Sequence, residues 1–122
     1  RHHPEVALLA LDRNAGAAGR NLGAERACTP FVAFTDDDSA WEPGALRRAA
    51  DVLEAHPRIA LLAARVSVGS DRREDPTCAA MAQSPLPREP GAPGPAVLGF
   101  SACGAVVRRE PFLAVGGFDR RY

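Results

Sequence analysis

Three consecutive aspartates at residues 36–38 follow a short apolar segment at residues 30–34, with only Thr35 between them. A continuous apolar run of this length is typical of a buried strand, so the acidic residues should lie at its carboxyl end. Like charges this close repel one another, and a bound divalent cation would offset the repulsion. Hard cations take carboxylate ligands and keep positions open for water and phosphate. The Asp-x-Asp pair formed by Asp36 and Asp38 therefore predicts a metal site.

The same residues could instead form a solvated acidic turn before a helix. Asp38 or Ser39 could cap that helix, and Ser39 with Glu42 has the spacing of a capping box. Pro43 fits this box poorly, because proline is favoured at the first helical position and would here fall beyond it. A single cap also does not require three acids. Both interpretations stay open at this point.

The remaining elements must position these aspartates. Apolar runs predict two further strands, at residues 5–12 and 58–66. A glycine-containing turn and a short helix at residues 20–27 precede the aspartates. An amphipathic helix should begin at Pro43, carry a stripe at i, i+3, i+4 and i+7 from Leu46, and end before Pro57. Alternating strands and helices favour an α/β sheet with mostly parallel neighbours and right-handed crossovers, whose sites lie at the carboxyl ends of strands.

The second half of the chain has a different composition. Six of the 11 prolines lie in residues 69–95, which we interpret as an exposed, mobile loop: a solvated linker, or alternatively a lid facing an acceptor. A strand is expected at residues 96–107, followed by a short helix that Gly116 and Gly117 close. With 122 residues, the chain is expected to form one domain.

Composition excludes several classes of function. The formal net charge is zero, which gives no global field for binding nucleic acid. All 15 basic residues are arginines, so Schiff-base and P-loop lysine mechanisms are excluded. The 3 cysteines are widely spaced and are expected to be reduced, in a cytoplasmic protein. No apolar run approaches the roughly 18 residues that a membrane span requires.

Three blocks together resemble a family 2 glycosyltransferase of the GT-A fold. Residues 13–27 resemble the family's Asn-x-Gly turn and Arg-Asn-x-Gly helix. Residues 30–66 resemble its Asp-x-Asp strand, proline-led helix and next strand. Residues 101–122 resemble the acceptor-side segment that closes on Gly-Gly-Phe-Asp. The match covers most of the chain apart from the proline-rich segment, and three blocks in order are more specific than any one of them.

The resemblance implies inverting transfer of a sugar from a nucleotide-diphosphate donor, with Mn²⁺ or Mg²⁺ as cofactor. The acceptor is unknown and could be a saccharide, a lipid-linked or a small molecule. Asp38 would be the main metal ligand, Asp36 would contact the metal or the donor's ribose, and Asp37 would bind the donor. Gly16 and Arg20 lie where the family places groups near the nucleotide. As alternatives, Gly16 is an ordinary turn glycine and Arg20 a surface arginine.

The acceptor-side segment would comprise Gly116, Gly117, Phe118 and Asp119, which could equally be a helix cap with a buried phenylalanine. The resemblance places the catalytic base beyond Tyr122 and a nucleotide-binding unit before the first residue. We therefore expect the chain to be a fragment that is inactive alone, with uncovered sheet surface that favours a homo-oligomer. The expected location is cytoplasmic, with any membrane association through other parts.

Two other classes of function compete with sugar transfer. Phosphatases of the haloacid dehalogenase type also place Asp-x-Asp after a strand, but there the motif normally opens the domain. A non-catalytic module that binds a nucleotide or a protein is the second alternative. The metal hypothesis further predicts that the carboxylates of residues 36–38 face a common point and are not engaged by neighbouring arginines.

Overall fold

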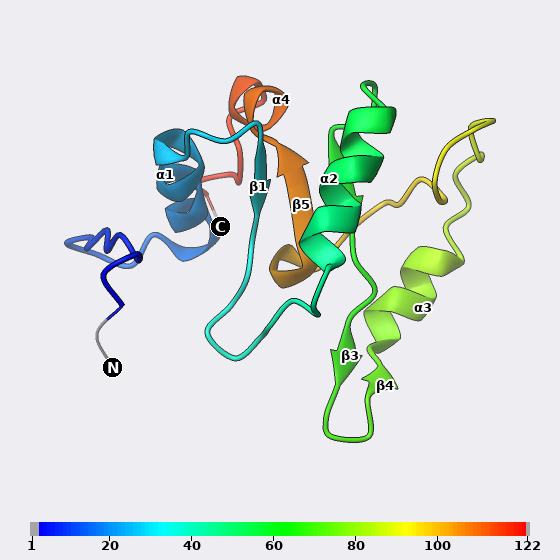
Figure 1. Ribbon diagram of the computed structural model, residues 1–122, viewed down its shortest axis with the longest axis horizontal. Helices are drawn as coiled ribbons and strands as arrows, with labels where there is room; N and C mark the ends of the chain where they lie inside the picture. Colours follow the sequence, from blue (N-terminus) through cyan, green and yellow to red (C-terminus); the bar gives the residue numbers. More distant parts are fainter. Residues whose placement is uncertain (1–2, 122) are drawn as a thin grey trace.

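The computed structural model describes residues 3–121, and a three-stranded sheet lies at its centre (Figure 1). The strands are β1 (Phe31–Ala33), β2 (Leu61–Ala63) and β5 (Ala105–Arg108), in the order β1-β5-β2. Both outer strands run antiparallel to β5, which places Val32 opposite Val107 and Leu62 opposite Val106. The apolar runs that predicted strands at 30–34 and 58–66 are thus confirmed, over shorter ranges.

The expectation of a mostly parallel sheet is wrong for the strands in residues 3–121. All strand pairs there are antiparallel. β1 and β2 run in the same direction, as a strand–helix–strand unit requires, but β5 lies between them and hydrogen-bonds to both. Apolar periodicity predicts that a segment is a strand; it does not predict that a strand from the end of the chain will separate two earlier neighbours. The α/β character of the fold is confirmed.

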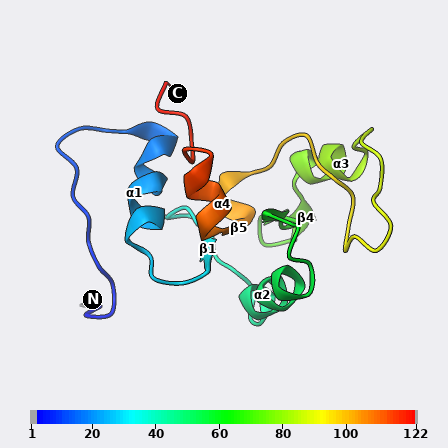
Figure 2. The same cartoon turned by 90° about the horizontal axis from the view of Figure 1, so that it is seen from above.

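Helices lie on both sides of this sheet. Figure 2 shows α2 (Ala45–Ala55) on one side, and α1 (Gly19–Arg26) with α4 (Arg109–Ala114) toward the other. All three helices occur where the sequence predicts them. The start of α2 differs, because Gly44 is its N-cap and Pro43 precedes the helix. The capping box expected for Ser39 and Glu42 is therefore not formed, and Asp38 does not cap α2.

The strand predicted at residues 5–12 is not present. The segment forms no helix or strand and runs outside α1 (Figure 2). Val6, Leu8 and Leu11 are exposed, with Leu8 at 88%, and Leu9 is partly buried. The apolar run correctly indicates a segment suited to burial, but a strand also needs a partner edge, and no described strand pairs with this segment.

The proline-rich region also differs from expectation, because part of it is regular. Strands β3 (Ser67–Val68) and β4 (Arg73–Glu74) form a hairpin, and α3 (Pro76–Ala82) follows. Asp75 caps α3 by accepting a hydrogen bond from the N–H of Thr77 at 2.8 Å. The pair Asp75–Pro76 is a cap followed by a first-position proline, a signal in the sequence that the count of prolines obscured. Residues 83–101 contain no helix or strand.

The core lies between β5 and the helices. Val107 and Ala105 of β5 are buried, and so is Phe34, which follows β1. A short 3-10 helix, η2 (Ala102–Gly104), leads into β5, so the strand predicted at residues 96–107 is confirmed only near its end. None of the helices in residues 3–121 combines the length and apolar character needed to cross a membrane.

Candidate functional site

The three aspartates form a tight turn at the carboxyl end of β1. The N–H of Ser39 donates to the carbonyl of Asp36 at 3.2 Å, which closes the turn. The Ser39 hydroxyl lies 2.9 Å from the backbone nitrogen of Asp36 and accepts its hydrogen bond. Ser39 thus acts on this turn instead of capping α2. The turn holds Asp37 and Asp38 at its exposed tip.

Helix α1 brings Arg20 to this turn. The Arg20 guanidinium forms an ion pair and hydrogen bond with the Asp36 carboxylate, and both side chains are partly buried. The repulsion among the three acids is thereby offset partly by an arginine. No group of three side chains in residues 3–121 is arranged as a metal cage. The predicted convergence of all three carboxylates on one cation is therefore not observed. The expectation that no neighbouring arginine engages the aspartates is wrong for Asp36, because Arg20 pairs with it.

The oxygen ligands that the turn offers still suit Mg²⁺ or Mn²⁺. Mg²⁺ is usually bound through one or two carboxylates together with waters and substrate phosphates, and Mn²⁺ accepts similar oxygen ligands. Asp37 and Asp38 are exposed carboxylates on adjacent residues. They fit a cation whose coordination a bound diphosphate completes, and they do not fit a cation held by protein groups alone.

Trp41 fixes the segment that leads from the aspartates to α2. Its indole N–H donates to the carbonyl of Phe34 at 3.2 Å, and the residue is half-buried. The ring thus serves packing. This bond joins the end of the turn back to the end of β1.

The acceptor-side residues form the predicted helix cap. The N–H of Gly117 donates to the carbonyl of Phe112 at 2.9 Å, and the N–H of Gly116 to that of Leu113 at 3.0 Å. These two bonds are those of a Schellman motif at the end of α4. Both glycines have positive φ, 88° and 67°, a conformation that side chains other than glycine's rarely adopt.

Phe118 is a core residue as well as part of this segment. Its ring contacts Phe34 and Phe112, with ring centroids 5.4 and 5.6 Å away. The alternative stated for this segment, a helix cap with a buried phenylalanine, is confirmed for the cap, while Phe118 is partly buried against the core. Because Phe34 directly precedes the aspartate turn, the aromatic contact also joins the two halves of the candidate site.

Asn21 is a residue of this site that the sequence analysis did not single out. Its side chain is buried, at 4% exposure, and hydrogen-bonds to the backbone of the Gly-Gly-Phe-Asp turn. Asparagine has a low helix propensity, and its position inside an eight-residue helix is the sequence signal that indicates a tertiary role.

The remaining candidates lie on the surface. Gly16 begins a short 3-10 helix, and its N–H donates to the side chain of Asn14 at 2.8 Å, which is a turn arrangement. Asp119 is exposed, and the Arg121 side chain and N–H hydrogen-bond to its carboxylate. These bonds hold the pKa of Asp119 below its ordinary value and raise that of Arg121.

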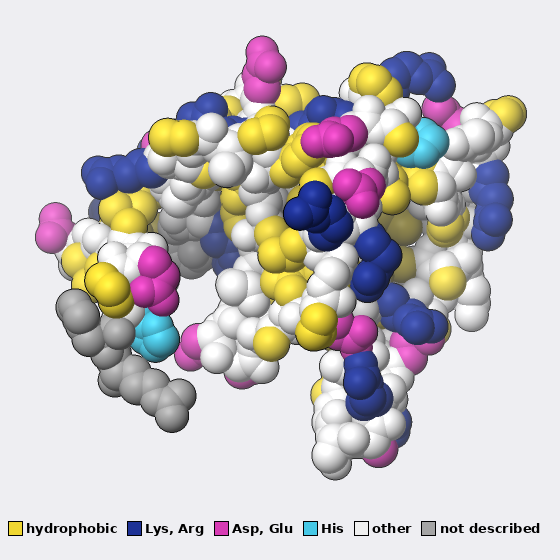
Figure 3. Space-filling model, viewed as in Figure 1, with side chains coloured by type: hydrophobic (Ala, Val, Ile, Leu, Met, Phe, Trp, Pro, Cys, Tyr) yellow, Lys and Arg dark blue, Asp and Glu magenta, His cyan; other side chains and the backbone are white. Residues whose placement is uncertain are grey.

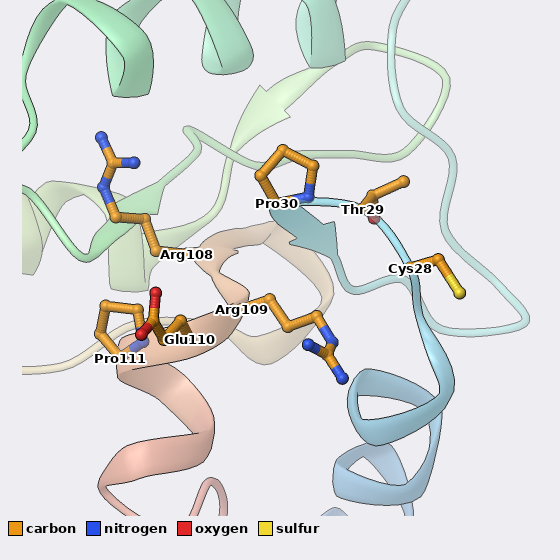
Figure 4. Close-up of a pocket in the computed structure, with 7 residues that line it drawn as sticks. All are labelled: Cys28, Thr29, Pro30, Arg108, Arg109, Glu110 and Pro111. Atoms are coloured by element: carbon orange, nitrogen blue, oxygen red, sulfur yellow. The ribbon is translucent and has the colours of Figure 1, made fainter.

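A cavity of about 410 Å³ lies at the opposite end of β1 from the aspartates (Figure 4). Cys28, Thr29 and Pro30 line it on one side. Arg108 and Arg109 lie on the other side, and their side chains point in different directions. Arg108 bonds to carbonyls at the end of α2, and Arg109 to those at the end of α1, so both arginines are engaged in structure. We do not assign the donor site to this cavity.

Charges of both signs are interspersed over the face shown in Figure 3. Together with the zero net charge, this distribution gives no broad field for attracting an anionic ligand. Recognition of an anion would therefore depend on local groups such as those around the aspartate turn.

Comparison with known families gives one match. A family model described as "Glycosyl transferase family 2" matches residues 1–116, which is most of the chain. Comparisons with curated proteins and with solved structures gave no match. The family match includes the first two blocks of residues identified in the sequence and residues 101–116 of the third. It favours sugar transfer over the phosphatase alternative.

Proposed function

The chain belongs to glycosyl transferase family 2, and we propose that its aspartate turn binds the diphosphate of a nucleotide-sugar donor through a divalent cation. The family implies glycosyl transfer between a nucleotide-sugar donor and an acceptor. Our proposal concerns how the donor is bound: the Asp-x-Asp turn holds a divalent metal ion, and the metal ion holds the diphosphate of the donor. The observation that carries the proposal is the position of Asp37 and Asp38, exposed together at the carboxyl end of β1.

Each residue of the turn has a separate role in this proposal. Asp38, with a neighbouring carboxylate, supplies oxygen ligands to Mn²⁺ or Mg²⁺. Arg20 holds the Asp36 carboxylate against α1, which fixes its orientation toward a donor ribose or the cation. Ser39 holds the backbone of the turn, which fixes where the exposed Asp37 and Asp38 leave the chain.

When bound, the cation would neutralise negative charge on the diphosphate leaving group. The chain's own residues contribute binding and orientation. Inverting transfer also requires a base that takes the proton of the acceptor hydroxyl. We assign no acid of this chain to that role.

A titration separates this function from a non-catalytic binding module. Binding of uridine, guanosine and thymidine diphosphates would be measured by calorimetry with and without Mn²⁺. We expect at least one of them to bind in a metal-dependent manner, and Asp38→Ala to weaken that binding by about tenfold or more. Asp51→Ala, which removes an exposed carboxylate from α2, is the matched control and should bind like the wild type.

The opposite results have a definite interpretation. Binding that does not depend on Mn²⁺, or that Asp38→Ala leaves unchanged, would favour the module. Absence of binding to all three nucleotides would contradict a donor site in this chain.

A further inference from the structure

Two adjacent side chains of α1 contact two turns that are far apart in the sequence. Arg20 bonds to Asp36 in the aspartate turn. Asn21 bonds to Gly116 and Phe118 in the turn that follows α4. The residue that contacts the proposed donor-binding turn, Arg20, is therefore the immediate neighbour in α1 of the residue that contacts the acceptor-side turn, Asn21.

The contact of Asn21 with Phe118 is reciprocal. The Asn21 Oδ1 accepts from the N–H of Phe118 at 2.8 Å, and its Nδ2 donates to the carbonyl of the same residue at 2.8 Å. A longer bond of 3.4 Å runs from Nδ2 to the carbonyl of Gly116. A carboxamide carries a donor and an acceptor side by side, and a carboxylate or an alkyl group does not. Asparagine is thus specifically suited to this position.

The packing around the contact leaves little room for another arrangement. A Cβ atom on Gly117 would lie 2.7 Å from the Asn21 Cγ, a distance that real side chains do not tolerate. With Asn21 at 4% exposure, water has little access to replace the lost bonds if the carboxamide is removed. The turn is therefore held by a specific buried contact as well as by its own helix cap.

We propose that Asn21 is a positioning residue, which sets the Gly-Gly-Phe-Asp turn at a fixed place relative to the aspartate turn. This inference rests on the proposed function, because the separation of the two turns matters for transfer only if a donor binds at the aspartates. Asn21 touches neither the donor nor the acceptor in this arrangement. It acts through the backbone of Phe118.

Hydrogen exchange on the full chain tests the proposal by NMR. In Asn21→Ala, we expect the protection factor of the Phe118 amide to fall about tenfold, because the side-chain oxygen that accepts its hydrogen bond is gone. The amide of Phe34, which donates to Ala105 in the core, reports global opening and should lose clearly less protection than that of Phe118. Equal loss at both amides would show that Asn21 merely stabilises the fold, and no loss at Phe118 would show that the contact is dispensable. Either result would overturn the proposal.

A second variant gives a readout that a general loss of stability would not produce. In Asn21→Asp, the ionised carboxylate can accept from Phe118 but cannot donate to its carbonyl. Once protonated, the same group can do both. We therefore expect the protection factor of the Phe118 amide, corrected for intrinsic exchange, to rise as the pH is lowered from about 7 to about 4.

The Asn21→Ala variant, which has no titratable group at this position, is the control for the pH series. A rise of equal size in both variants, or no rise in Asn21→Asp, would overturn the proposed role of the carboxamide. Mn²⁺-dependent binding of a nucleoside diphosphate should stay within about threefold of the wild type in both variants, because the aspartate turn keeps Arg20. A wild type that binds no nucleotide would refute the proposed function, and the exchange results would then still decide whether Asn21 fixes the turn.

Discussion

The rings of Phe34 and Phe118 meet edge to face with centroids 5.4 Å apart. Phe34 ends the segment that leads from β1 into the aspartate turn, and Phe118 ends the Gly-Gly turn after α4. The contact therefore joins the proposed donor and acceptor sides through the hydrophobic core. Phe112, with its ring 5.4 Å from that of Phe34, completes the cluster.

This aromatic contact predicts energetic coupling between the two turns. We expect a double-mutant cycle of Phe34→Leu and Phe118→Leu to give an interaction energy of about 0.5–1.5 kcal/mol, measured by urea unfolding. Pairing Phe34→Leu with Val68→Ala, in the exposed β3–β4 hairpin, provides the control and should be additive. Additivity of the two phenylalanine substitutions would contradict the coupling.

The two glycines after α4 provide a matched pair. Both have positive φ, so Gly116→Ala should destabilise the chain by about 1–2 kcal/mol through backbone strain alone. Gly117→Ala should lower the free energy of unfolding by about 1 kcal/mol or more beyond the effect of Gly116→Ala, because the new methyl group collides with Asn21. Overpacking of a protein core has a similar cost. Urea unfolding of both variants measures the difference. If Gly116→Ala were equally or more damaging, the close approach of Asn21 to Gly117 would be wrong.

Arg108 connects the end of β5 to the end of α2. Its guanidinium bonds to the carbonyls of Leu53 and Ile59, the second at 2.9 Å, and lies 5.3 Å from the centre of the Phe31 ring. Arg108→Ala should lower the free energy of unfolding by about 1.5–3 kcal/mol, because hydrogen bonds from a charged group to the last carbonyls of a helix are lost. Arg47→Ala, at an exposed position of α2, should change it by less than about 0.5 kcal/mol. Similar effects of both substitutions in thermal or urea unfolding would contradict this role.

The pairing of Asp119 with Arg121 predicts a change in titration. Hydrogen bonds from Arg121 lower the pKa of Asp119, so Arg121→Ala should raise that pKa toward its ordinary value, as carbon-detected NMR can measure. A carboxyl whose pKa is depressed in the folded state stabilises the fold above its unfolded pKa, and this contribution disappears as the pH falls below about 4. High salt should reduce the pKa difference between wild type and variant, because both groups are exposed. An unchanged pKa in Arg121→Ala would show that the pair does not persist in solution.

Local patterns in the sequence predicted individual elements better than their assembly. The stripe that starts at Leu46 predicted α2, the apolar run at 30–34 predicted β1, and the two glycines predicted the end of α4. The sheet order could not be predicted, because the insertion of β5 between β1 and β2 depends on contacts between segments distant in the chain. The apolar run at residues 5–12 failed as a strand prediction for the same reason: periodicity does not supply a partner.

The candidate site was predicted to a similar extent. The position of Asp36–Asp38 after β1 follows from the apolar run before it and is observed. The expectation that no arginine engages these aspartates is wrong, because Arg20 pairs with Asp36. The pairing of Arg20 with Asp36 depends on how closely α1 packs against the turn. No local sequence pattern predicts that packing distance. The role of Asn21 depends on two turns meeting one helix, and only the three-dimensional arrangement reveals it.

Paramagnetic broadening by Mn²⁺ tests the central claim most directly. In the presence of a nucleoside diphosphate that binds, Mn²⁺ should broaden the NMR amide signals of residues 36–39 most strongly. It should affect those of Thr29 and Glu110 far less, since they line the cavity at the opposite end of β1. Broadening centred on that cavity, or spread evenly over the chain, would contradict a metal–diphosphate site at the aspartate turn.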